Sequence, residues 1–180
     1  MYSFESIVAY MLERQGYWVR TSVKVDLTKA EKVKIGRKTC PRWELDVVGY
    51  KGGKKELIVL ECKSFLNSAG VCVETFLGNC PKDENRYKLF FDQNLRDTVL
   101  SRLETQLTES KSCGPIRHVR FGLAAGRING DVNILEDQFK KKNWVLFSPD
   151  KIREELETLA GTRYENAVIP AMTKILLRKR

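Results

Sequence analysis

The sequence predicts an α/β fold in which a mixed central sheet is flanked by helices. The first half contains a segment at residues 3–15 in which apolar residues recur with the helical period, followed by three short segments with the composition of strands. The second half alternates helical and strand patterns. With 42% hydrophobic and 31% charged residues in 180, the chain is globular in composition and large enough for one core. Because no linker divides it, we expect one domain over residues 1–180.

The first element is an amphipathic helix over residues 3–15. Its apolar residues recur near the helical period, at Phe4, Ile7, Val8, Met11 and Leu12. Ser3 is of a residue type that caps helix N-termini, and Gly16 is of the type that ends helices.

Three strands follow at residues 17–25, 42–50 and 56–64. The first is rich in β-branched and aromatic residues, and the third contains a short apolar run. The segment 51–55, which contains two glycines, is a turn that makes the second and third strands hairpin partners. The polar and basic segment 26–41 is expected to be a long hairpin connection. These three strands therefore predict an antiparallel meander.

Gly, Asn and Pro residues in segment 66–85 predict a loop. The elements expected after it are a long helix at 86–109, a strand at 116–126, a short helix at 136–143, a strand at 144–148, a helix that starts at Ser148 with Pro149 and Asp150 in its first turn, and a last helix at 164–178. The long helix is a crossover connection between strands, and it gives the sheet its mixed character.

The chain carries a formal net charge of +9, which favours polyanionic partners such as nucleic acid. Its five cysteines are odd in number and lack CxxC spacing, as is typical of a reduced compartment. Glu5 and Glu13 interrupt the apolar residues at the start, so no signal peptide is expected. No apolar run reaches membrane-spanning length. We therefore expect a cytoplasmic protein with no membrane partner.

The third predicted strand ends in charged residues, in the stretch IVLECKS at 58–64. Because side chains alternate along a strand, Glu61 and Lys63 share one face. On the preceding strand, Glu44, Asp46 and Val48 are expected to share a face, with the apolar neighbours of Asp46 on the other. If the two charged faces coincide, Asp46, Glu61 and Lys63 converge.

Two carboxylates held together in a partly buried site repel each other and lose hydration, at a cost of several kcal/mol per ion. A divalent cation offsets this cost, and magnesium takes one or two carboxylates while it keeps waters. Lys63 beside the cation is suited to hold a water or a phosphate oxygen. Such a group of residues suits phosphodiester hydrolysis. The alternative is that Glu61 and Lys63 form an ordinary ion pair at a strand end.

These residues resemble the PD-(D/E)xK nuclease superfamily, which has the restriction-endonuclease-like fold. Asp46 is followed, after fourteen residues, by Glu61, Cys62 and Lys63. The αβββαβ core of that superfamily matches the predicted order of elements through residue 126, and residues 127–180 would add a further strand and helices. The opening FESIVAYMLERQGYWV, with an acid in the first helix, is similar to that of Mrr-like and Holliday-junction-resolvase-like members. One departure is that leucine, not proline, precedes Asp46.

The resemblance implies a Mg²⁺- or Mn²⁺-dependent deoxyribonuclease that acts in restriction, defence, repair or recombination. Asp46 and Glu61 would bind the metal, and the backbone carbonyl of Cys62 would be a further ligand. Lys63 would orient the attacking water or stabilise charge in the transition state. Glu5, in the first helix, would complete the metal site.

Two further residues are secondary candidates for this site. Glu44 shares the expected face of Asp46 and is a substitute ligand. Gln106 lies beside the apolar stripe of the long helix, from which its side chain would reach the site.

The basic run 29–38 is expected to contact phosphates, although it also fits a solvated hairpin tip. Its contact residues would be Lys29, Lys32, Lys34, Arg37 and Lys38. DNA is the expected partner, and RNA stays open. A homodimer also stays open: many nucleases of this fold act as dimers because cutting both strands needs two sites, but the sequence shows no interface. The alternatives are a non-catalytic nucleic-acid-binding module that retains the fold and an interaction subunit of a larger complex.

Overall fold

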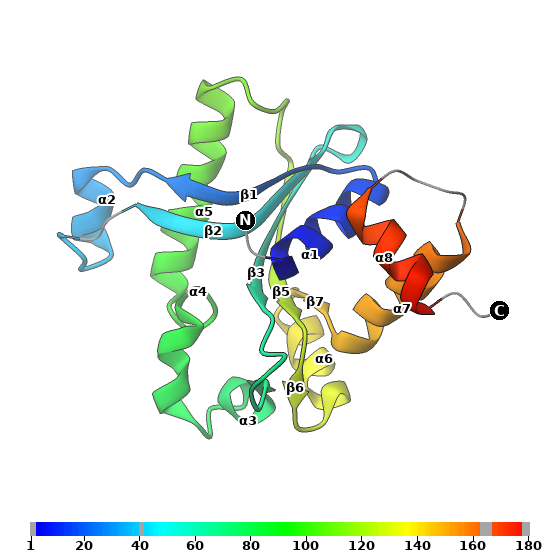
Figure 1. Ribbon diagram of the computed structural model, residues 1–180. Helices are drawn as coiled ribbons and strands as arrows, with labels where there is room; N and C mark the ends of the chain where they lie inside the picture. The colour runs from blue at the N-terminus through cyan, green and yellow to red at the C-terminus, as the bar shows by residue number, and fades with distance from the viewer. Residues whose placement is uncertain (1–2, 40–41, 163–166, 178–180) are drawn as a thin grey trace.

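The structure is a computed structural model that describes residues 3–39, 42–162 and 167–177, and it confirms an α/β fold with a mixed central sheet (Figure 1). The first three strands of the sheet are antiparallel neighbours, and the last two run parallel to the third. In spatial order the strands are β1 (Trp18–Val25), β2 (Trp43–Lys51), β3 (Glu56–Lys63), β5 (His118–Ala125) and β7 (Val145–Phe147).

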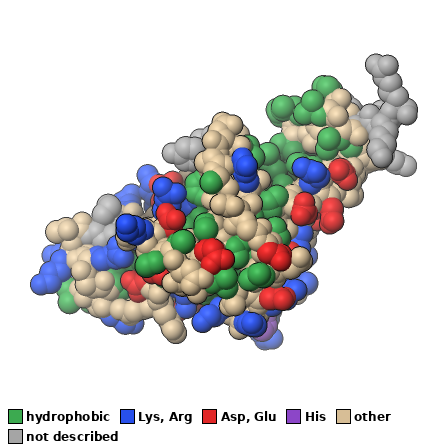
Figure 2. Space-filling model, turned by 90° about the horizontal axis from the view of Figure 1, so that it is seen from below, with side chains coloured by type: hydrophobic (Ala, Val, Ile, Leu, Met, Phe, Trp, Pro, Cys, Tyr) green, Lys and Arg blue, Asp and Glu red, His purple; other side chains and the backbone are tan. Residues whose placement is uncertain are grey.

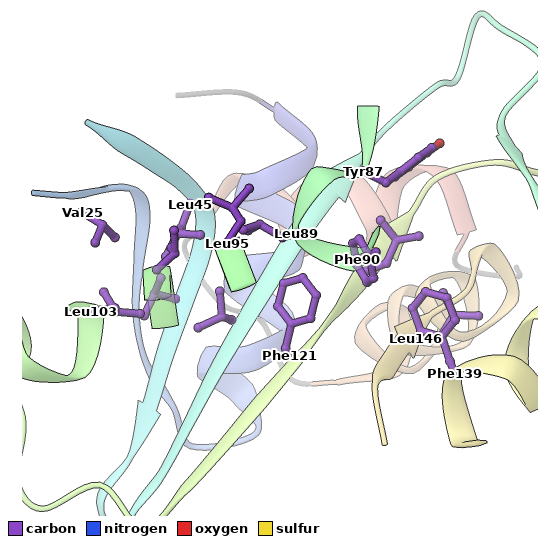
Figure 3. Close-up of a cluster of buried hydrophobic side chains, with 14 of the residues drawn as sticks. Val25, Leu45, Tyr87, Leu89, Phe90, Leu95, Leu103, Phe121, Phe139 and Leu146 are labelled. Atoms are coloured by element: carbon purple, nitrogen blue, oxygen red, sulfur yellow. The ribbon is translucent and has the colours of Figure 1, made fainter. Parts of the chain in front are cut away.

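Helices cover both faces of this sheet (Figure 1). On one face lie α1 (Ser3–Arg14), which begins at Ser3 itself and ends before Gly16, and α7 (Pro149–Gly161), which Ser148 caps as expected. Buried residues of both helices pack there on β3. On the other face, α5 (Gln93–Glu109) packs its apolar stripe on the sheet; Figure 3 shows this larger core. The two cores fix the strands that carry the candidate site.

The prediction of one helix at 86–109 is wrong, because the chain is divided there at Asp92. A short helix, α4 (Lys88–Phe91), precedes this residue, and α5 follows it. The Asp92 carboxylate accepts a hydrogen bond from the Leu95 backbone N–H at 2.9 Å. An aspartate that bonds the backbone in this way competes with helix continuation and starts a new helix instead.

Segment 66–85, predicted as loop, contains three short elements. They are β4 (Val71–Cys72), α3 (Val73–Phe76) and the 3₁₀ helix η2 (Pro81–Arg86). Strand β4 pairs in parallel with β6 (Ile128–Asn129), far along the chain. Elements this short depend on tertiary contacts, so periodicity does not reveal them.

The connection 26–41 was expected to be irregular, but it contains α2 (Lys29–Lys34). Thr28 and Glu31 form a reciprocal capping box at its start, which explains the helix. A second difference is that α6 (Val132–Lys141) begins before the predicted residue 136, because Asp131 caps it. The turn at 51–55 contains the 3₁₀ helix η1 (Gly52–Lys54).

The last predicted helix, at 164–178, is observed as α8 (Val168–Leu177); residues 164–166 and 178 of that prediction lie outside the described residues. α8 packs on α7 and leaves several apolar side chains exposed, and green side chains gather at that end of the molecule in Figure 2. Among the described residues, no helix combines the length and the apolar character that crossing a membrane requires.

Candidate metal centre

The candidate site forms where β2 and β3 separate. Their ladder begins at the hairpin turn and ends at the pair Val47–Leu60. Beyond this pair β2 stays bonded only to β1, as the pair Val23–Leu45 shows. In the opening, Asp46 Oδ2 accepts a hydrogen bond from the Cys62 backbone N–H at 2.7 Å. The Asp46 side chain therefore bridges two strands that no longer share backbone bonds.

The faces of β2 do not alternate as expected through Asp46. Val47 packs in the core beneath α1, whereas Leu45 and Val48 both pack in the core beneath α5. The expected alternation is therefore wrong, because residues three apart on a regular strand face opposite sides. On β1, Ser22 has a left-handed φ of 53° between the paired Thr21 and Val23. Local distortion of both strands is what re-aims the side chains at this point.

The separated strands open into a cavity of about 260 Å³. Glu44 and Asp46 of β2 line it together with Glu61 and Lys63 of β3, so the structure brings these four predicted residues together. Four further residues line the cavity but were not predicted from the sequence: Trp43, Asn85, Arg86 and Lys88. Trp43 lies beside the predicted acids in sequence, but no local signal links residues 85–88 to them.

Glu61 is a largely buried acid of the cavity, with only 12% of its side chain exposed. Its Oε2 atom is buried without a hydrogen bond among the described residues, and Lys63 Nζ lies 3.9 Å away. Burial raises the pKa of Glu61 to about 7; the Lys63 charge opposes this shift and the Asp46 charge adds to it. Glu61 therefore changes protonation near neutral pH, where a cation can replace the proton.

Glu5 and Cys62 belong to the α1 face of β3. The Cys62 side chain is buried in the core beneath α1, as the alternation of β3 predicted. Burial raises the pKa of its thiol, and the charges of Asp46 and Glu5 raise it further. Glu5 Oε2 is also buried without a hydrogen bond among the described residues. Glu5 does not line the cavity, so the structure does not bring it together with Asp46, Glu61 and Lys63 there.

Gln106 does not reach the site. Its Nε2 donates to the Lys24 carbonyl at 2.9 Å, and its Oε1 accepts from the Asp26 N–H at 3.1 Å. Both ends of the amide thus fasten the end of β1 to α5, which is a structural role.

The basic run 29–38, which includes α2, is connected to the cavity through one residue, Arg37. Lys29, Lys34 and Lys38 are exposed, and blue side chains gather at that end of the molecule in Figure 2. Arg37 is held instead, because its guanidinium lies 5.7 Å from the Trp43 ring centroid and 3.8 Å from the Asp92 carboxylate. Since Trp43 lines the cavity, Arg37 joins the run to the site.

Asp46 and Glu61 are the residues of the cavity that could hold a divalent cation. Within the described part of the chain, no three or more histidine, cysteine, aspartate or glutamate side chains are grouped to hold a metal. Magnesium, however, needs only one or two carboxylates beside its waters, and Asp46 and Glu61 supply two. The buried Oε2 atom of Glu61 accepts no hydrogen bond among the described residues, and the Lys63 ammonium, 3.9 Å away, lies beyond hydrogen-bond distance. A cation is the partner that suits it.

Comparison of the chain with protein-family models, with curated proteins and with solved structures finds no match. The residues of this cavity and their surroundings are therefore what indicates the function.

Proposed function

We propose that the protein is a metal-dependent endonuclease that hydrolyses DNA phosphodiester bonds. One observation carries this proposal: Asp46, Glu61 and Lys63 line one cavity at the point where β2 and β3 separate. Two carboxylates and an ammonium at such a position suit a cation and a phosphate. The order of elements from α1 to β5 supports a restriction-endonuclease-like core of the PD-(D/E)xK type.

In this proposal Asp46 and Glu61 hold Mg²⁺ or Mn²⁺, with the Cys62 carbonyl as a further ligand. The bound ion would neutralise charge on the phosphate and lower the pKa of a water. Lys63 orients the attacking water or stabilises the negative charge of the transition state. The oxygen of that water bonds to phosphorus while the bond from phosphorus to the leaving sugar oxygen breaks. Glu5 supports the site from the α1 side.

The experiment measures DNA cutting by the parent protein and by the variants Asp46→Ala and Lys63→Ala, with Mg²⁺ or Mn²⁺. Both variants should lose about a hundredfold or more in rate, as is typical when a charge-stabilising group is removed. Chelation of the metal should stop the parent.

The matched controls are Asp137→Ala and Lys140→Ala, which break an exposed ion pair of 3.3 Å on α6. These controls should cut like the parent, because exposed pairs contribute little to stability. Equal cutting by the parent, Asp46→Ala and Lys63→Ala would mean that the site is misplaced.

A second candidate function is a non-catalytic nucleic-acid-binding module. The observation that favours it is the ion pair of 3.9 Å between Lys63 and Glu61, which balances both charges without a metal. Such a module binds DNA or RNA with strong salt dependence but cuts no duplex, branched or single-stranded form. Metal-dependent turnover of any of these substrates would exclude it.

A further inference from the structure

The candidate cavity has a second wall, which faces the strands that carry the carboxylates. Asn85 and Arg86 at the end of η2 and Lys88 at the start of α4 form this wall. The first wall is mainly acidic, with Glu44, Asp46 and Glu61, and the second wall contains two cations and an amide. A ligand of this cavity must therefore be compatible with the carboxylates of one wall and with the cations of the other.

The fold holds this wall in place through Tyr87. Only 2% of Tyr87 is exposed, and its ring packs against Phe76 with 5.1 Å between the centroids. Figure 3 shows Tyr87 beside Phe90 at the edge of the larger core. Because Tyr87 is anchored in the core, its neighbours Arg86 and Lys88 are left at the cavity.

Among the described residues, neither cation of this wall forms an ion pair with a carboxylate of the first wall. Lys88 makes no ion pair within 4 Å with any described residue. Among the described residues Arg86 pairs only with Asp83, at 3.9 Å, and 67% of its side chain is exposed. A pair this exposed is weak, so the guanidinium is available to a stronger anion.

The charges of the lining are balanced in number. The carboxylates are Glu44, Asp46 and Glu61, and the cations are Lys63, Arg86 and Lys88. A divalent cation held by the carboxylates would make the sum positive. The cavity therefore attracts an anion, although one of its walls is acidic.

We propose that Arg86 and Lys88 form a phosphate-binding wall that holds the sugar-phosphate backbone of a nucleic acid across the cavity. Arginine bonds phosphate oxygens through its planar fork, lysine contributes a point charge, and the Asn85 amide supplies a further donor. A cavity of about 260 Å³ has room for a phosphate group and not for a folded duplex, so the rest of the strand lies outside it. The contacts are made to phosphate, and binding is therefore independent of base sequence.

This inference deepens the proposed function, because it names how the substrate of the same site is held. Its test measures binding rather than cutting. Short fluorescent DNA duplexes of two unrelated sequences are titrated with the parent, Arg86→Ala and Lys88→Ala over a series of salt concentrations, with Ca²⁺ in place of Mg²⁺. Each variant should reduce the slope of log affinity against log salt by about one, equally for both sequences.

Lys54→Ala is the matched control, because Lys54 is exposed in η1 at the other end of the β2–β3 hairpin. It removes the same charge and should keep the slope of the parent. Arg86→Lys and Lys88→Arg should restore that slope. Thermal unfolding of all variants checks that they fold. Slopes for Arg86→Ala and Lys88→Ala that equal the slope of Lys54→Ala would overturn the inference.

The two proposals fail separately. If the parent cuts DNA and Asp46→Ala does not, while Arg86→Ala and Lys88→Ala bind with the parent slope, only the phosphate-binding wall is wrong. If no protein cuts but both wall variants lose slope, the wall stands and the nuclease proposal falls.

Discussion

Glu61 links the stability of the protein to pH. Its pKa is about 7 in the folded protein, against an ordinary value of 4.5. Between these two pH values the folded state keeps a proton that the unfolded state has released. The stabilisation is therefore complete below pH 4.5 and is lost as the pH rises through 7. At about 1.4 kcal/mol per pKa unit, the loss is on the order of 3 kcal/mol.

The first prediction follows from this loss. Glu61→Gln removes the buried charge and keeps the shape, so at pH 8 without divalent metal it should exceed the parent in stability by up to about 3 kcal/mol. Near pH 4 the two proteins should be equally stable. Urea unfolding at both pH values measures the difference. Glu157→Gln, at an exposed position of α7, is the control and should show no such change. A difference between Glu61→Gln and the parent that is the same at both pH values would contradict the argument.

The second prediction concerns the cation itself. A metal that binds only the folded state raises the unfolding temperature. Mn²⁺ or Mg²⁺ should therefore raise the unfolding temperature of the parent at pH 8, and raise it less at pH 5, where the Glu61 proton competes. Thermal unfolding with and without the metal measures this effect.

In the same assay Asp46→Asn should lose the metal-dependent shift, although its amide oxygen can still accept the Cys62 hydrogen bond. Asp137→Asn, on the exposed face of α6, should keep the shift. A parent protein that shows no shift at either pH does not bind the ion.

At the scale of elements, the pairing of β5 with β7 depends on one glycine. A Cβ atom on Gly122 would lie 2.1 Å from the Val145 carbonyl oxygen, which is backbone and cannot move alone. The third prediction is that Gly122→Ala costs more than about 4 kcal/mol, because β7 must leave its register. Gly53→Ala is the matched control, since nothing lies within 4 Å of that position. Urea unfolding compares the two; a Gly122→Ala variant as stable as Gly53→Ala would contradict this packing.

Elements with a strong internal pattern could be predicted from the sequence. The period of α1 and the β-branched runs of the first three strands gave their positions closely. The capping box of α2 was also readable at Thr28 and Glu31, and its omission was an error of interpretation. By contrast, β4 and β6 pair with each other across a long stretch of chain, so no local pattern marks them.

The candidate site also contains some residues that could be predicted from the sequence and others that could not. Asp46, Glu61 and Lys63 could be grouped because they lie on the two neighbouring strands of a hairpin, away from its turn. The distortion at Ser22 and Asp46 could not be predicted, because it arises from the separation of β2 from β3. Arg86 and Lys88 line the cavity because Tyr87 between them packs against Phe76 and Phe90 in the larger core, which no local pattern indicates.

At the scale of the whole molecule, positive charge is gathered in separate places. One group is formed by the exposed Lys29, Lys34 and Lys38 at the α2 end. Another is the run of exposed lysines at 140–142, at the end of α6. Figure 1 shows α2 at the left edge of the molecule and α6 well apart from it, in the lower part near α3 and β6. If nucleic acid follows the path from α2 past Arg37 and Trp43 to the cavity, the first group contacts phosphates and the second does not.

The last prediction compares two triple variants that lower the formal net charge equally, from +9 to +6. One replaces Lys29, Lys34 and Lys38 by alanine, and the other replaces the three lysines at 140–142. Each phosphate contact contributes about 0.9 to the slope of log affinity against log salt, so the α2 variant should lose nearly three units. The α6 variant should lose little, because distant exposed charges are screened at moderate salt. Fluorescence titration of one DNA duplex measures both slopes. Equal losses in the two variants would mean that overall charge, and not a path through α2, governs binding.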